Sequence, residues 1–154
     1  MPGPDRAHAE PAAQNAAASG LAELLLAGDQ FRQAIAERLQ VGVTETIALS
    51  QLGEAGPMTA RELSRRIGLT PSTVTSVLDR LQVAGLAERS AHPTDRRQIV
   101  ISLTSKGKKS LAWTRVVLNE AVQSVKAEHL PVVGTAMYEL ATELRRQAVV
   151  LKKA

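Results

Sequence analysis

Residues 58–103 read MTARELSRRIGLTPSTVTSVLDRLQVAGLAERSAHPTDRRQIVISL and decide the fold of this 154-residue chain. The stretch opens with a predicted short helix. Thr59 and Glu62 have the spacing of a capping box, in which each side chain hydrogen-bonds the other's backbone amide. Gly68 can adopt the left-handed conformation that ends a helix. A helix is therefore expected between Thr59 and Gly68.

A second helix is predicted directly after the first. Thr70 is a favourable N-cap residue, and Pro71 follows at the first helical position, where its missing amide costs nothing. Only residues 68–70 then separate the two helices. A turn of this length is typical of a helix-turn-helix.

The second helix has one apolar and one polar side. Its apolar residues recur at threes and fours and should pack inward. Its polar side carries short hydroxyl groups and one arginine, which let a helix approach a DNA major groove closely while offering donors and acceptors. An ordinary solvated helix would show the same pattern, so both interpretations stay open at this point. The apolar set is Val74, Val77, Leu78 and Leu81, and the polar set is Ser72, Thr73, Thr75, Ser76, Asp79 and Arg80.

Two short predicted strands follow, at residues 86–89 and 99–103. The second strand alternates, with Ile99 and every second residue after it on one face. The segment between the strands, residues 90–98, is too polar to be buried and contains adjacent arginines. A charged tip is usually a solvated turn. Next to a helix-turn-helix, however, such a hairpin is typical of a wing.

Taken together, these motifs resemble the MarR family of winged helix-turn-helix regulators. The resemblance covers about the central third of the chain. It implies a mostly α fold with a small β-hairpin wing, in which a winged helix-turn-helix is joined to a helical dimerisation region. One position departs from the family's sequence pattern: the family often has a large basic residue after Thr-Val-Thr, whereas this chain has Ser76. The matching residues are Gly56-Pro57-Met58-Thr59, Glu62-Leu63, Gly68 to Thr75, Asp79-Arg80-Leu81, Ala84-Gly85-Leu86, Pro93 to Arg97, and Thr104 to Gly107.

Charge and composition favour a nucleic-acid partner over catalysis. The formal net charge is +4, but residues 58–110 alone hold ten basic and four acidic residues, a concentration that suits a polyanion. The absence of cysteine excludes disulfides, thiolate metal sites and a cysteine oxidation sensor. The three histidines are scattered, and no phosphate-binding loop, nucleophile elbow or metal motif is present. We therefore expect no enzyme, no metal and no cofactor.

The remaining sequence divides into three predicted regions. Residues 1–19, rich in alanine and proline, are expected to form a disordered tail because they cannot bury enough apolar surface. Residues 20–43 and 105–152 carry long amphipathic helical patterns and are assigned to the dimerisation region, and residues 44–104 to the DNA-binding region. The apolar faces of these helices could pack within the same chain, but packing against a second copy of the chain is favoured. Neither a signal peptide nor a membrane span is visible, so a cytoplasmic protein is expected.

The predicted function is sequence-specific binding of double-stranded DNA in transcription regulation. The resemblance implies a homodimeric repressor on a palindromic operator, released by a small aromatic ligand. The alternative is a winged-helix protein-interaction module that does not bind DNA. In the DNA reading, residues 71–83 enter the major groove, and the wing places Arg97, or else Arg96, in the minor groove. The candidate DNA-binding residues are Arg61, Ser72, Thr73, Thr75, Ser76, Arg80, Arg89, Asp95, Arg96, Arg97 and Lys106.

Candidate ligand contacts follow from the same resemblance. Members of the family commonly bind aromatic compounds where the dimerisation helices meet the winged module. Trp113 is the chain's one tryptophan, and a large ring with a single donor can stack on a ligand and orient it. Simple packing of Trp113 between helices is the competing interpretation. The candidates by position are Phe31, Gln51, Leu52, Trp113 and Arg115.

Overall fold

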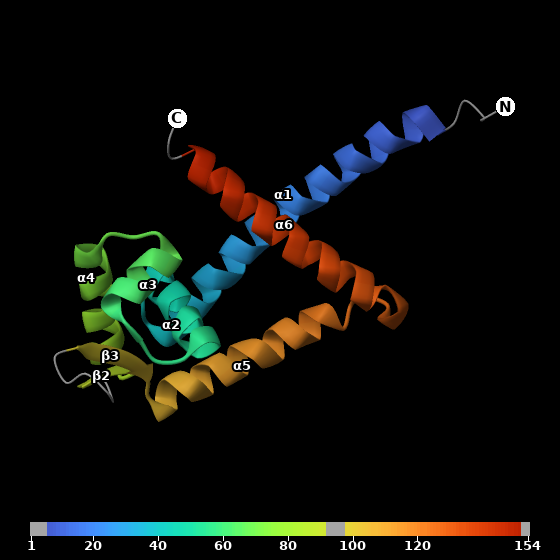
Figure 1. The fold of residues 1–154 in the computed structure, drawn as a ribbon. Coiled ribbons are helices and arrows are strands. Elements are labelled where there is room, and N and C mark those ends of the chain that lie inside the picture. Colours follow the sequence, from blue (N-terminus) through green and yellow to red (C-terminus); the bar gives the residue numbers. More distant parts are fainter. Residues whose placement is uncertain (1–5, 92–97, 152–154) are drawn as a thin grey trace. The chain divides into compact units, whose positions relative to one another are not determined.

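A computed structural model describes residues 6–91 and 98–151 of the chain (Figure 1). The fold is mostly helical with one small antiparallel sheet, which confirms the predicted fold class. The chain forms two units, Met1–Ala112 and Trp113–Ala154. The elements are α1 (Arg6–Leu39), α2 (Val43–Ala55), β1 (Met58–Thr59), α3 (Ala60–Ile67), α4 (Pro71–Val83), β2 (Ala87–Ala91), β3 (Ile99–Leu103), α5 (Ser105–Val122), the 3-10 turn η1 (Ala127–His129) and α6 (Leu130–Leu151).

The helix-turn-helix begins and ends at the predicted residues. The capping box of α3 is present: Thr59 Oγ1 accepts from the Glu62 amide at 3.2 Å, and Glu62 Oε2 accepts from the Thr59 amide at 2.8 Å. Gly68 ends α3 in the left-handed conformation, with φ of 68°. The Thr70 side chain caps α4 by accepting from the amide of Thr73, and Pro71 opens the helix.

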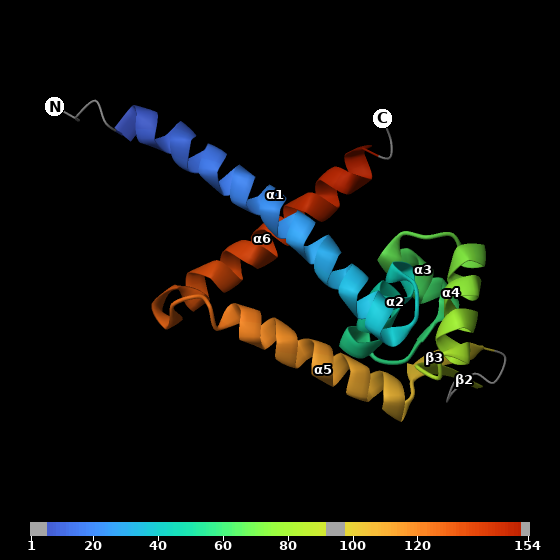
Figure 2. The same ribbon diagram turned by 180° about the vertical axis from the view of Figure 1, so that it is seen from behind.

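The winged unit is closed by a compact apolar core. Buried side chains from α2, α3, α4 and the sheet form one cluster, and Figure 2 shows these helices gathered beside β2 and β3 from behind. The predicted inner face of α4 is confirmed, since its apolar side chains are 2% exposed or less. This packing fixes which side of α4 faces outward. The central members are Leu49, Leu63, Val74, Val77, Leu78, Leu81, Leu86 and Ile101.

The sheet has one more strand than the sequence predicted. Its order is β1-β3-β2, with Met58 opposite Ile101 and Ala91 opposite Ile99. A strand of two residues is too short to show a period, so β1 left no pattern to detect. The expected alternation in β3 is wrong at its first residue: Ile99 is 51% exposed, whereas neighbouring Val100 is 7% exposed. Val100, Ile101 and Leu103 are buried, so burial along β3 does not follow strict alternation.

The first helix differs most from expectation. It begins at Arg6, so the expected disordered tail over residues 1–19 is wrong for residues 6–19. Those residues include seven alanines, and alanine has the highest helix propensity, so a helix can extend here although residues 11–19 are exposed. The small apolar surface of this segment was therefore the wrong criterion for predicting disorder. The next helix, α2, has extended Gly42 as its N-cap residue.

The second unit consists of the end of α5, the turn η1 and α6. The helix α5 ends at Val122. Along α6 none of the described residues is buried in the single chain. In the single chain these apolar side chains are exposed: Val116, Leu118, Val122, Met137, Leu140 and Leu144. Across the described part of the chain, no helix combines the length and apolar character that spanning a membrane would need.

Candidate nucleic-acid interface

The exposed side of α4 carries the four predicted hydroxyl residues: Ser72, Thr73, Thr75 and Ser76. Thr75 Oγ1 donates to the carbonyl of Pro71 at 3.0 Å, and Ser76 Oγ donates to that of Ser72 at 3.4 Å. A hydroxyl that donates into its own helix still has lone pairs directed outward. These side chains therefore present acceptors for base amino groups, with little bulk to hold α4 away from a groove.

Ion pairs hold both flanks of this exposed side. On one flank Arg80 pairs with Glu45 of α2. On the other, Arg89 of β2 donates to Asp79 Oδ1 at 2.7 Å and to Gln82 Oε1 at 3.2 Å. Both arginines were predicted to meet DNA. The structure places them at the edges of α4, each with guanidinium N–H groups left over after these bonds.

Lys106 has a structural contact that the sequence did not reveal. Its Nζ donates to the carbonyl of Ala84 at 2.8 Å, at the C-terminal end of α4. Thr104 Oγ1 donates to the adjacent carbonyl of Gly85 at 2.7 Å and accepts from the amide of Gly107 at 3.0 Å. Thr104 thereby caps α5. The first turn of α5 is thus fastened to the end of α4.

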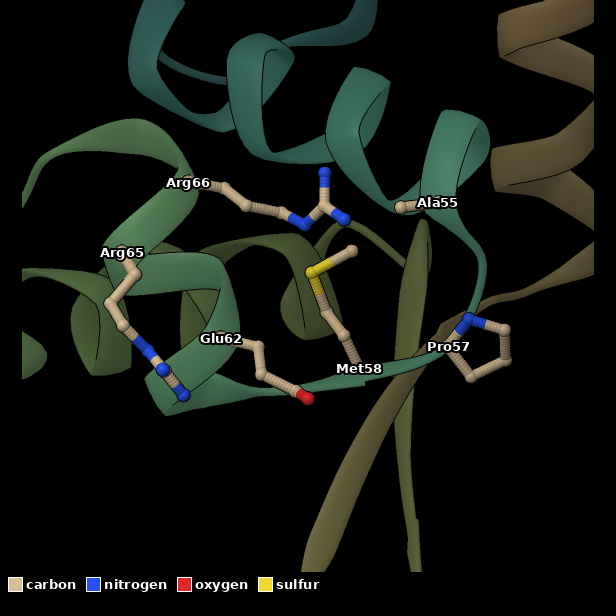
Figure 3. A pocket seen from close by; sticks show the side chains of 6 residues that line it. All are labelled: Ala55, Pro57, Met58, Glu62, Arg65 and Arg66. Atoms are coloured by element: carbon tan, nitrogen blue, oxygen red, sulfur yellow. The ribbon is translucent and has the colours of Figure 1, made fainter.

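The basic residues of α3 lie beside a shallow hollow. Arg61 is exposed, and its carbonyl accepts from Arg65 Nε at 3.4 Å. Figure 3 shows Arg66 extending over Met58 toward the end of α2, whereas Arg65 extends in another direction. The hollow has a volume of about 410 Å³ and is lined by Ala55, Pro57, Met58, Glu62, Arg65 and Arg66. Its arginines add positive charge to the unit that contains α4.

The predicted tip of the wing lies outside the described residues. Asp95, Arg96 and Arg97 all belong to this segment. Its two ends are placed, because β2 ends at Ala91 opposite Ile99 of β3. The wing residues therefore remain predictions from the sequence. Within residues 6–91 and 98–151, no group of three or more acidic or histidine side chains is arranged to hold a metal ion.

The ligand candidates fall on three helices. Phe31 of α1 and Gln51 of α2 are half-buried, and the Gln51 amide donates to Glu54 at 3.2 Å. Leu52 is 2% exposed and belongs to the core of the winged unit. Trp113, 37% exposed, and exposed Arg115 stand at the start of the second unit. Their joint role as a pocket remains a prediction.

Sequence reasoning missed Glu45, an ionisable residue that is only 2% exposed. Its partner Arg80 is 35 residues away, so no local spacing connects them. The available signal was an acidic residue in the first turn of a helix whose apolar side packs inward. Gln82 was missed for a similar reason, because its contact with Arg89 depends on how β2 packs against α4.

Comparison with known proteins agrees with this geometry. Residues 43–99 match the model of the MarR family. The chain is 37% identical over 99 residues to the uncharacterized HTH-type transcriptional regulator YcgE of Bacillus subtilis, covering 64% of each chain. It is 30% identical over 105 residues to YsmB of the same organism, covering 66% of this chain and 72% of YsmB. The match to YcgE thus spans a little under two thirds of that relative's length.

A solved structure extends the similarity beyond the aligned sequence. The crystal structure of RV1404 from Mycobacterium tuberculosis superimposes with a TM-score of 0.65 at 25% identity, covering 84% of this chain and 92% of that one. The capped helix-turn-helix, the three-stranded wing sheet and these relatives lead to the same conclusion. This chain belongs to the MarR family.

Proposed function

We propose that this protein is a homodimeric transcription regulator that binds double-stranded DNA sequence-specifically. The observation that carries the proposal is the exposed side of α4, where small hydroxyl residues at positions 72–76 are followed by Arg80 and by Asp79, the ion-pair partner of Arg89. A helix with this surface fits a major groove, where base edges differ in their donors and acceptors. The family membership and the names of the relatives support regulation by DNA binding.

The contacts divide into two kinds. Ser72, Thr73, Thr75 and Ser76 face the bases, while Arg61 and Arg89 meet phosphates. Phosphate contacts set the position of the protein on the duplex, and base contacts set its sequence preference. The wing places Arg97, or else Arg96, in the flanking minor groove. Lys106 supports the end of α4 through Ala84 and adds charge beside it.

The proposed homodimer would cover apolar surface that the single chain leaves exposed. Apolar side chains of α1, α5 and α6 are exposed, including Leu24, Leu140 and Leu144. Exposed apolar area of this kind normally marks a protein-protein contact. A second copy related by a two-fold axis covers it and presents two copies of α4, so the operator is an imperfect palindrome.

Repression and its release complete the proposal. A dimer bound across two half-sites blocks access to a promoter. A small aromatic ligand lowers DNA affinity by binding more tightly to a dimer whose α4 helices have a different separation. The candidate contacts for this ligand are Phe31, Gln51, Leu52, Trp113 and Arg115.

Selection from a random double-stranded library tests the proposal. Full-length protein should enrich a duplex with two related half-sites, and gel shifts should show loss of binding as salt is raised. Recovery of sequences without any common motif would refute sequence-specific recognition. It would favour the protein-interaction alternative instead.

A further inference from the structure

Glu45 is an ionisable side chain in an unusual place. It lies in the first turn of α2 and is 2% exposed, next to core residues Ala48 and Leu49. Burying a carboxylate is costly unless a cation and hydrogen bonds compensate for its lost hydration. Here the compensating cation comes from α4, because Glu45 Oε1 accepts from Arg80 Nε.

The carboxylate is confined on its other side as well. A Cβ at Gly42 would lie 2.2 Å from Glu45 Oε2, so this oxygen occupies space that the N-cap leaves open only because it is glycine. A negative charge in the first turn of a helix is also favoured by the helix dipole. Glu45 is therefore held between the start of α2 and the flank of α4.

Arg80 differs from its partner in exposure. Its side chain is 59% exposed, although Nε is engaged by a carboxylate that is 2% exposed. Arg80 follows Ser72 and Ser76 at intervals of four residues, so all three lie along one side of α4. The terminal Nη groups carry four further N–H donors in the plane of the guanidinium.

We propose that Glu45 is a positioning residue for sequence recognition, which acts through Arg80 and does not touch DNA. By accepting a hydrogen bond from Nε, Glu45 fixes the plane of the Arg80 guanidinium beside Ser72 and Ser76. The remaining N–H donors of Arg80 then meet hydrogen-bond acceptors of the operator in one orientation. Glu45 also offsets the charge of Arg80, which reduces attraction to DNA of any sequence. The pair thus increases the difference between operator and other DNA. This inference rests on the proposed function.

A purely structural pair would behave differently. If Glu45 and Arg80 only stabilise the packing of α2 on α4, their loss lowers stability and affects all duplexes alike. Selectivity separates the two roles, as does a double-mutant cycle in DNA affinity, because a residue that acts through Arg80 has no effect once Arg80 is removed.

The test measures fluorescence anisotropy with two labelled duplexes, one selected by the wild type and one a shuffled sequence of equal length. Glu45→Gln keeps the size and an acceptor but removes the charge. It should weaken binding of the selected duplex about tenfold, the usual scale for losing a base-reading contact, without weakening binding of the shuffled one. Arg80→Ala should cost a similar factor on the selected duplex, and adding Glu45→Gln to it should change selectivity no further. The matched control is Glu54→Gln, which removes the same charge from an exposed position of α2.

A second variant keeps a cation opposite Glu45. Arg80→Lys alters an exposed side chain and keeps its charge, but an ammonium lacks the planar fork. It should lose selectivity as Glu45→Gln does, while circular dichroism shows a folded protein. Wild-type selectivity in Arg80→Lys, equal weakening of both duplexes in Glu45→Gln, or additive effects in the double variant would each overturn the inference alone. A wild type that does not distinguish the duplexes would overturn the proposed function with it.

Discussion

Replacing Gly107 by alanine tests how the start of α5 is joined to the end of α4. Gly107 is buried in the first turn of α5. A Cβ there would lie 2.1 Å from the carbonyl oxygen of Leu86 and 3.1 Å from its carbon. The obstructing atoms are backbone, and the same oxygen accepts from the Thr104 amide at 3.1 Å. Rotating a side chain cannot relieve this contact, so α5 must move away from Leu86, which lies between α4 and β2.

Two opposing effects set the size of the change. Alanine in place of glycine inside a helix stabilises by about 1 kcal/mol. Overpacking a tight interior costs about 1–3 kcal/mol, and a backbone contact at this distance belongs in the upper part of that range. The free energy of unfolding should therefore fall by a net amount of roughly 1–2 kcal/mol. Without this steric contact, Gly107→Ala would instead raise the free energy of unfolding.

Urea unfolding followed by circular dichroism measures this change. Gly28→Ala in α1 is the matched control, because its Cβ would meet only Arg32 Nη1, at 3.9 Å. The control should raise stability by roughly 0.5–1 kcal/mol. Gly107→Ala equal to or more stable than the wild type would refute the close packing of α5 on Leu86.

Three further predictions concern DNA, assembly and ligand. Arg97→Ala should weaken binding of a selected duplex by about 1–3 kcal/mol at unchanged thermal stability, and an unchanged dissociation constant would remove Arg97 from the interface. Light scattering at micromolar protein should give the mass of two chains, and a footprint should cover half-sites about 34 Å apart; a monomer or a single protected half-site would contradict the dimer. A phenolic compound that releases DNA should quench Trp113 emission over the same concentration range, and release with constant emission would exclude Trp113 from the pocket.

Local chemistry made the helix-turn-helix predictable. The ends of α3 and α4 depend on residues within a few positions, such as Thr59, Glu62 and Thr70, so their spacing is visible in the sequence. The inner face of α4 was predictable for the same reason, since its period is set by one helix. Once the inner face of α4 was assigned, the hydroxyl residues could be placed on its exposed side.

Features that depend on distant packing were not predictable. The partner of Arg80 is on another helix, and β1 exists only because β3 pairs with it. The length of α1 was misjudged because low apolar content was read as disorder, although alanine sustains a helix without burial. Lys106 was assigned to phosphate from its charge, whereas its contact with Ala84 depends on how α5 approaches α4.

Sequence-specific DNA recognition by the wild type is tested most directly by binding free energies for the selected and shuffled duplexes over a range of salt concentrations. The selected duplex should bind at least about 10³-fold more tightly at physiological salt. The logarithm of each association constant should fall with the logarithm of salt concentration, with a slope of about −0.9 per phosphate contact. Equal affinity for both duplexes, or affinity that does not change with salt, would contradict recognition of DNA by α4 and the wing.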